Sequence, residues 1–139
     1  MPAKRRNRKA VRGGVAARTP ARPPTVVRIA ALPNQNARRA GDPPFKIRPA
    51  CVIVYKDDVV RFLNMTSVDI QLSGSSMSFG RAKANRPCIL KAGRRTVIHH
   101  PTSAGPYPYV VKRRQDGRSR FDTEIPGESS PEVIVDDEA

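Results

Sequence analysis

Apolar side chains in this chain recur with a period of two, in short runs that are separated by turn-forming residues. The clearest run is SVDIQLSG, in which Val68, Ile70 and Leu72 alternate with Asp69 and Gln71. Because successive side chains of a β-strand point to opposite faces, this alternation predicts a strand with one buried face. Similar runs recur roughly every 8–12 residues with no helical period between them, which predicts an all-β fold, an antiparallel β-sandwich.

Three further segments refine this expectation. RPACVIVYKDD is apolar at both odd and even positions, and it therefore predicts a strand that is covered on both faces. PYPYVVKRR predicts a strand with Tyr107, Tyr109 and Val111 on one face. The segment at residues 74–87, GSSMSFGRAKANRP, has no alternation and predicts a long, solvated, irregular loop.

Composition divides the chain into three parts. Residues 1–44 are rich in Arg, Pro and Ala, and we expect a disordered basic arm and linker, because such a segment cannot bury enough apolar surface to offset its ordering entropy. One apolar island within it, TVVRIAAL at residues 25–32, either adds a strand to the body or docks on a partner. Residues 45–137 are the predicted β-sandwich domain, and residues 138–139 are its acidic end.

Charge is distributed unevenly along the chain. Its 26 Lys and Arg against 12 Asp and Glu give a formal net charge of +14. Residues 1–48 contain 13 of the basic residues and one acid, whereas residues 121–139 contain seven acids and no base. A basic head and an acidic tail on one chain are expected of a protein that contacts a polyanion.

The candidate residues for binding nucleic acid or another polyanion form two groups. The first group, in the arm, comprises Lys4, Arg5, Arg6, Arg8, Lys9, Arg12, Arg18 and Arg22. The second group, in the body, comprises Arg94, Arg95, Lys112, Arg113 and Arg114, with Arg118 and Arg120 nearby. If the strands that carry the second group form an antiparallel hairpin, its members share one surface.

Binding by these residues would be electrostatic. Each neutralised phosphate releases counterions, so affinity falls as salt rises. Sequence-specific recognition is not expected, because nothing in the chain resembles a groove-entering helix, a zinc finger or an RNP aromatic pair. The alternative is that the arginine-rich N-terminal arm only keeps the protein solvated and binds no polyanion.

The cysteines and the N-terminus bear on the compartment. Cys51 and Cys88 fit neither a zinc spacing nor a Cys-x-x-Cys motif, and we expect free buried thiols, with a disulfide left open for an exported protein. The N-terminal arginines are not followed by the apolar run of a signal peptide, and no segment approaches the ~20 apolar residues of a membrane span. The expected location is therefore the cytoplasm.

Several segments resemble, in the same order, those of the cupredoxin-like (plastocyanin-like) β-sandwich family. YKDDVVRFLN resembles the opening strand pair, with Asp58, Phe62 and Asn64 at the family's places. LKAGRRTVI follows, then GPYPYVV, which resembles Gly-x-Tyr-x-Tyr-x-Cys, and GESSPEVIVDD resembles the closing strand. The resemblance covers about residues 45–137 and implies a Greek-key arrangement of the strands.

The same resemblance implies a fold without its copper ligands. A blue-copper site needs a thiolate, two imidazoles and a weak axial Met. The thiolate place falls on Val111, the first imidazole place on Asp69 or Ile70, and the second within residues 112–116, which contain no His. No Met occurs beyond Met77. We therefore expect neither a metal nor another cofactor, and we expect the adjacent His99 and His100 to point to opposite faces of a strand.

Catalytic motifs are also missing. No Gly-x-Ser-x-Gly elbow surrounds Ser75, Ser76 or Ser78, and the adjacent Asp57 and Asp58 read as a turn rather than as a paired acid and base. The expected function is thus a non-enzymatic binding module, a metal-free cupredoxin-like domain with a polybasic arm. Two alternatives stay open: a self-assembling, coat-like protein with a genome-binding arm, and a cupredoxin-type copper protein for electron transfer.

Overall fold

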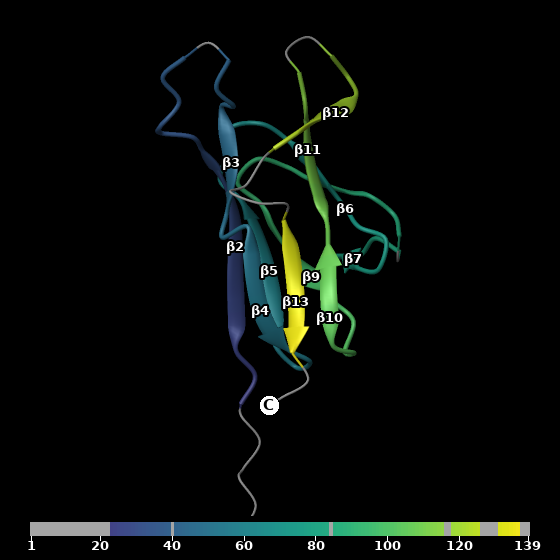
Figure 1. Ribbon diagram of the computed structural model, residues 1–139. Helices are drawn as coiled ribbons and strands as arrows, with labels where there is room; N and C mark the ends of the chain where they lie inside the picture. Colours follow the sequence, from purple (N-terminus) through teal and green to yellow (C-terminus); the bar gives the residue numbers. More distant parts are fainter. Residues whose placement is uncertain (1–22, 40, 84, 116–117, 126–130, 137–139) are drawn as a thin grey trace, which may run out of the picture.

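The computed structural model describes residues 23–39, 41–83, 85–115, 118–125 and 131–136, and within them it contains β-strands and no helix (Figure 1). The strands are β2 (Val26–Pro33), β3 (Phe45–Arg48), β4 (Cys51–Tyr55), β5 (Val59–Asn64), β6 (Ile70–Ser73), β7 (Ser78–Phe79), β8 (Cys88–Leu90), β9 (Arg95–His99), β10 (Gly105–Pro108), β11 (Val110–Arg114), β12 (Phe121–Glu124) and β13 (Glu132–Asp136). The all-β prediction is confirmed. No helix suited to crossing a membrane occurs in the part of the chain described.

The strands form three sheets that enclose one core. The five-stranded sheet has the order β3-β2-β5-β9-β7, the four-stranded sheet β12-β11-β6-β8, and the three-stranded sheet β10-β13-β4. Only Tyr109 separates β10 from β11. The chain therefore passes directly from the three-stranded sheet into the four-stranded sheet at this residue (Figure 1). Side chains of all three sheets meet in a single apolar cluster.

Strand β5 illustrates why these segments become strands. Val60 and Phe62 are fully buried, while Arg61 between them lies on the outer side of the sheet. Phe62 meets the ring of Tyr109 edge-on at 6.3 Å between centroids, which joins the five-stranded sheet to the opposite layer. Ile70 and Leu72 in β6 are also fully buried, so the predicted alternation is confirmed there.

Strand pairing is mixed, and the prediction of purely antiparallel pairing is wrong for two pairs. β2 runs parallel to β5, from Val26 opposite Val59 to Ala31 opposite Asn64. β13 runs parallel to β4, from Glu132 opposite Cys51 to Asp136 opposite Tyr55. In both pairs a long connection separates the partners, which parallel pairing requires and which a hairpin-based reading of the sequence does not anticipate.

The folded body includes β2, and so extends upstream of residue 45, where the sequence placed its start. Ile29 and Ala31 are buried in the core. At the start of the strand, the Asp58 carboxylate accepts a hydrogen bond from the Thr25 backbone N–H at 2.9 Å, and Thr25 O accepts one from Val59 N–H. The apolar island at residues 25–32 thus adds a strand to the body. Residues 1–22 of the expected arm lie outside the described residues.

Two other expectations need correction. Strand β4 is not covered on both faces, because Val52 and Val54 face the core while Ile53 is 66% exposed. The segment at residues 74–87 is not wholly solvated, because Met77 and Phe79 are buried and β7 lies within it. A two-residue strand with one inward side chain has no period by which the sequence could reveal it.

The two cysteines are free, as expected, and lie in different sheets. Cys88 is half-buried, whereas Cys51 is exposed, so the expectation of a buried thiol is wrong for Cys51. The reason is the alternation in β4, which turns Cys51 outward together with Ile53.

Candidate anion-binding site

Four neighbouring strands of the five-stranded sheet each place one arginine on its outer face. Most inward positions of these strands are apolar, so alternation turns the arginines away from the core. They are Arg48 on β3, Arg28 on β2, Arg61 on β5 and Arg95 on β9. We call this set the arginine face.

The strand register fixes how the four arginines are arranged. Arg28 and Arg61 are direct partners across the β2–β5 pair. Two residues further along these strands, Ala30 and Leu63 are partners of one another. On its other side, Ala30 is the partner of Arg48, and Leu63 is the partner of Arg95. The four residues form a row across the sheet, with an arginine at each end and two apolar residues between them. At ~4.8 Å between strands, the two ends are about 14 Å apart along the sheet.

A shallow groove lies between the four side chains. Its volume is about 290 Å³, and its lining consists of Arg28, Ile29, Ala30, Arg48, Arg61, Leu63, Met65 and Arg95. The residues between the arginines are all apolar, and Met65 is 54% exposed. The arginine face is therefore an arc of positive charge beside an apolar floor.

No acidic side chain pairs with these four arginines within the described part of the chain. Neither an ion pair nor a side-chain hydrogen bond engages any of the four guanidinium groups there, and no acidic residue lines the groove. Like charges that face each other across neighbouring strands destabilise a sheet by roughly 0.2–1 kcal/mol. An anion that contacts the guanidinium groups would relieve this repulsion and receive bidentate hydrogen bonds.

Of the body residues proposed from the sequence, only Arg95 belongs to the arginine face. The predicted hairpin does not form, because β9 lies in the five-stranded sheet while β11, with Lys112, Arg113 and Arg114, lies in the four-stranded sheet. Between them the chain passes through β10, which pairs with β13 instead. Arg94 precedes β9 in a turn, where its N–H donates to Lys91 O.

The basic residues of β11 make local contacts instead. The guanidinium carbon of Arg113 lies 5.7 Å from the Phe45 ring centre, and that of Arg114 lies 4.3 Å from the Phe121 ring centre. Lys112 is the cross-strand partner of Glu124. The eight arm residues from Lys4 to Arg22 lie outside the described residues.

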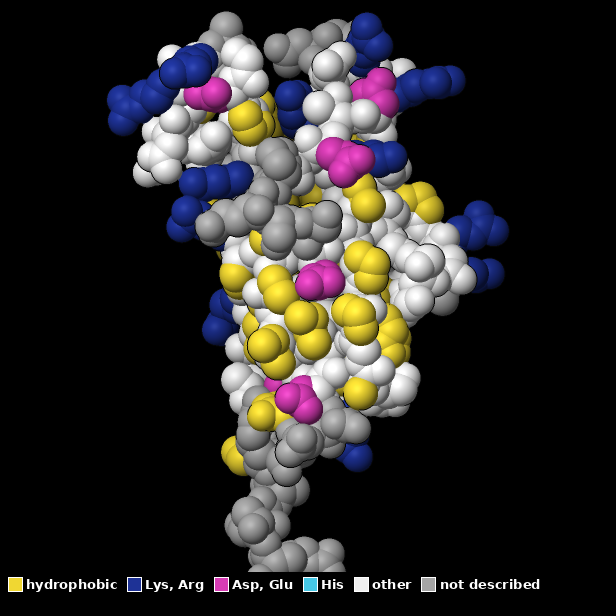
Figure 2. Space-filling view, viewed as in Figure 1, with side chains coloured by type: hydrophobic (Ala, Val, Ile, Leu, Met, Phe, Trp, Pro, Cys, Tyr) yellow, Lys and Arg dark blue, Asp and Glu magenta, His cyan; other side chains and the backbone are white. Residues whose placement is uncertain are grey.

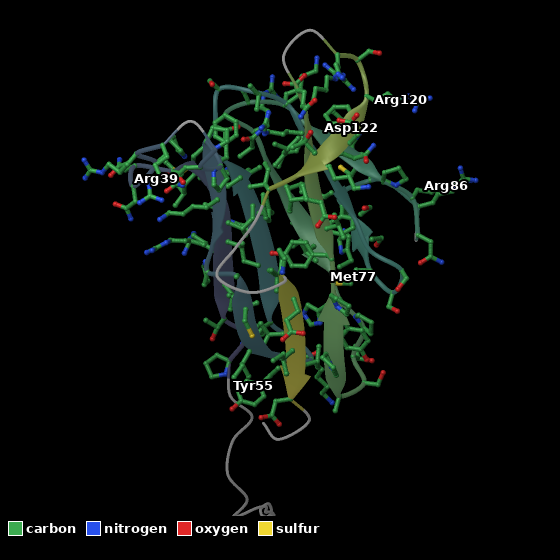
Figure 3. All side chains as sticks on the ribbon, turned by 45° about the horizontal axis from the view of Figure 1, so that its top comes forward. Arg39, Tyr55, Met77, Arg86, Arg120 and Asp122 are labelled. Atoms are coloured by element: carbon green, nitrogen blue, oxygen red, sulfur yellow. The ribbon has the colours of Figure 1, made fainter. Side chains whose placement is uncertain are left out.

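Sequence reasoning missed Arg28, Arg48 and Arg61. The alternation in VVRIAAL and VVRFLN does indicate that Arg28 and Arg61 each lie on the outward face of a strand. What the sequence does not contain is the parallel pairing of β2 with β5, which brings the two arginines side by side. Arg86, by contrast, extends from the loop before β8 away from the sheets (Figure 3).

The residues present do not fit the copper site of the cupredoxin family. Val111, to which the sequence resemblance assigned the thiolate place, is buried in the apolar core and has no donor atom. His99 Nε2 lies 3.1 Å from Gly80 O, while His100 has Nδ1 2.8 Å from Pro101 O and Nε2 2.9 Å from Asp58 O. The described residues contain no group of three or more His, Cys, Asp or Glu that could hold a metal ion.

Outside the arginine face, the pKa of the Tyr109 hydroxyl and that of the Cys51 thiol are both raised. Burial raises the pKa of the Tyr109 hydroxyl, and nearby Cys51 adds a smaller contribution. That hydroxyl is buried without a hydrogen-bond partner, with the Phe62 and Phe79 rings nearby. The pKa of the Cys51 thiol is also raised, mainly by desolvation of the sulfur and to a smaller extent by the negative charge of Glu132. The sulfur lies 3.8 Å from Glu132 Oε1.

Comparison with known proteins gives little. No protein-family model and no curated protein matches the chain. Among solved structures, it matches the crystal structure of Lac15 from a marine microbial metagenome at 17% identity with a TM-score of 0.29. That match covers 83% of this chain and 36% of Lac15. So low a TM-score supports no conclusion about fold family or activity.

Proposed function

We propose that this protein is a non-enzymatic binding module that holds nucleic acid or another polyanion electrostatically. Its frame is a metal-free, Greek-key β-sandwich of the cupredoxin type, and its binding surface is the arginine face. The observation that supports this most strongly is the cross-strand pair Arg28 and Arg61, two adjacent like charges with no acidic neighbour in the groove. The net charge of +14 acts in the same direction, by steering polyanions toward the protein.

The shape of this surface favours contact with phosphates rather than with base edges in a groove. A sheet face is too broad to enter the major groove, which admits a helix or a two-stranded ribbon. Guanidinium groups grip phosphates in two places at once, and such contacts carry no sequence information. The proposed binding is therefore insensitive to sequence and strongly sensitive to salt, with the basic arm adding further phosphate contacts.

Fluorescence anisotropy with labelled nucleic acid across a salt series tests this proposal. A full chain carrying Arg28→Gln and Arg61→Gln should show a slope of log affinity against log salt that is shallower by about 2. The matched control carries Arg81→Gln and Arg86→Gln, which remove the same charge from the exposed loop before β8. Equal loss in both variants, or no binding by the unmodified chain at low salt, would refute the proposal.

One observation favours a second candidate function, coat-like self-assembly. The outer face of the three-stranded sheet carries a row of apolar side chains, Ile53, Ile134 and Pro106, across β4, β13 and β10. Figure 2 shows apolar side chains gathered over this part of the molecule. A second copy could bury this patch, and light scattering of the purified chain would reveal symmetric assemblies. A monomer at high concentration would exclude this candidate.

A further inference from the structure

The four arginines form an arc rather than a straight line. Arg48 and Arg95 stand at the two ends of one row, on the outer strands β3 and β9. Arg28 and Arg61 stand two residues away along the middle strands β2 and β5, a displacement of about 7 Å. A chain-like ligand that crosses β3, β2, β5 and β9 would therefore meet one arginine on each of these four strands. Its path would bend around the apolar floor.

The apolar floor limits which polyanion fits this arc. Ala30 and Leu63 occupy the space between the row ends, and the exposed side of Met65 borders them. A ligand that offers only phosphate or sulfate groups would leave this floor in contact with water. A better partner carries regularly spaced anionic groups on one side and a flat apolar surface on the other.

Single-stranded nucleic acid has this combination, because each residue offers a phosphate and an unpaired base with two exposed faces. A duplex stacks those faces inside the helix and presents only phosphates and groove edges. We propose that the arginine face binds single-stranded nucleic acid, with phosphates along the arc and a base on the floor of Ala30, Leu63 and Met65. This inference rests on the proposed function and names the partner of the same site.

The side chains that line the groove indicate how much a bound base would add to the binding affinity. No aromatic ring lines the groove, so the stacking platform that many single-strand binders use is absent from it. The base instead buries apolar area against aliphatic side chains, and guanidinium planes stack beside it. Covering about 50 Å² of apolar surface corresponds to roughly a tenfold gain in affinity.

An abasic strand separates the two contributions, because it keeps every phosphate and lacks every base. Anisotropy with the full chain would compare single-stranded DNA and RNA of about 12 nucleotides, an abasic strand of equal length, the matching duplex and polyglutamate. We expect the single strands to bind about tenfold more tightly than the abasic strand at equal salt. The duplex is expected to show no such gain per phosphate contact.

Floor variants test where that gain arises. Met65→Ser with Leu63→Ser should remove the preference for bases while leaving affinity for the abasic strand unchanged, and Met65→Ser alone, at an exposed position, serves if the double variant fails to fold. Ile53→Ser, on the three-stranded sheet, is the matched control and should keep the preference.

The outcomes separate the two proposals. Equal binding of the abasic and normal strands, or polyglutamate binding as tightly as the single strands, would overturn the single-strand inference. Equal abasic and normal binding would still leave electrostatic binding of a polyanion in place. If none of the probes binds at low salt, both proposals fail.

Discussion

Arg28 and Arg61 are direct cross-strand partners on the outer face of the five-stranded sheet, and neither has an acidic neighbour in the groove that they line. Adjacent strands bring their backbones to ~4.8 Å, so the two guanidinium groups repel one another unless an anion lies between them. This arrangement is expected to lower the stability of the free protein, and it is the basis of the proposed anion-binding surface.

Neutralising one member of this pair should stabilise the free protein. We expect Arg61→Gln, which keeps most of the aliphatic stem, to raise the free energy of unfolding by about 0.2–1 kcal/mol at low salt. The gain should shrink in high salt and should disappear in an Arg28→Gln background. Urea denaturation of the two single variants and the double variant measures this coupling. Additive gains would show that the two charges do not interact.

Tyr109→Phe should stabilise the protein at neutral pH, because it removes a buried hydroxyl that has no hydrogen-bond partner. The expected gain in unfolding free energy is about 1 kcal/mol. Urea denaturation at neutral pH measures it. A clear loss of stability would mean that the hydroxyl makes a stabilising hydrogen bond.

The same substitution has a consequence at alkaline pH. The pKa of the Tyr109 hydroxyl is raised in the folded protein, so below the unfolded value of about 10 both states hold the proton and the full stability is present. Above that value only the unfolded state releases it, and the stability of the unmodified protein falls as pH rises. The advantage of Tyr109→Phe should therefore widen between about pH 9 and pH 11. A constant difference across this range would contradict the assignment.

Glu132→Gln should make the Cys51 thiol more reactive. The carboxylate lies beside the sulfur and helps to raise the pKa of the thiol, so its removal increases the thiolate fraction. Alkylation of Cys51 near pH 8 should accelerate roughly twofold, as fits one exposed charge. Cys88, whose pKa is raised by burial alone, is an internal control that mass spectrometry follows in the same sample. An equal change at both cysteines would point to a general loss of structure.

Asp58→Ala should destabilise the protein by weakening the attachment of β2. The two carboxylate oxygens accept hydrogen bonds from Thr25 N–H and Tyr55 N–H, each at 2.9 Å, and Asp58 is buried. Loss of bonds to a charged acceptor predicts a decrease of about 2–3 kcal/mol in unfolding free energy. Asp57→Ala, at the adjacent exposed position, should change it by less than about 0.5 kcal/mol. Equal effects would refute the anchoring role.

Sequence reasoning succeeded where local alternation decides the structure. The inward positions of β5 and β6, including Phe62 and Leu72, follow from the period of two alone. It failed where a contact depends on a strand remote in the chain. The parallel partners of β2 and β4, the exposure of Ile53 and the burial of Phe79 all depend on such neighbours.

The candidate site shows the same limit. Arg95 was selected for its charge, but the assumed hairpin grouped it with Lys112 and Arg114, which lie in another sheet. On the arginine face its neighbouring strand β5 carries Arg61, and Arg48 lies at the far end of the same row, on strands that meet only after folding. Charge along the sequence is the basis for proposing a polyanionic ligand, whereas the location of the candidate site required the sheet register.

Chemical-shift mapping of the isotope-labelled full chain, titrated with a short single-stranded oligonucleotide, tests whether the arginine face is the binding surface. We expect the largest amide and guanidinium shifts in β2, β3, β5 and β9 around Ala30 and Leu63, and little change in β10 and β13. Shifts centred on the three-stranded sheet, or none in the folded body at low salt, would contradict this expectation.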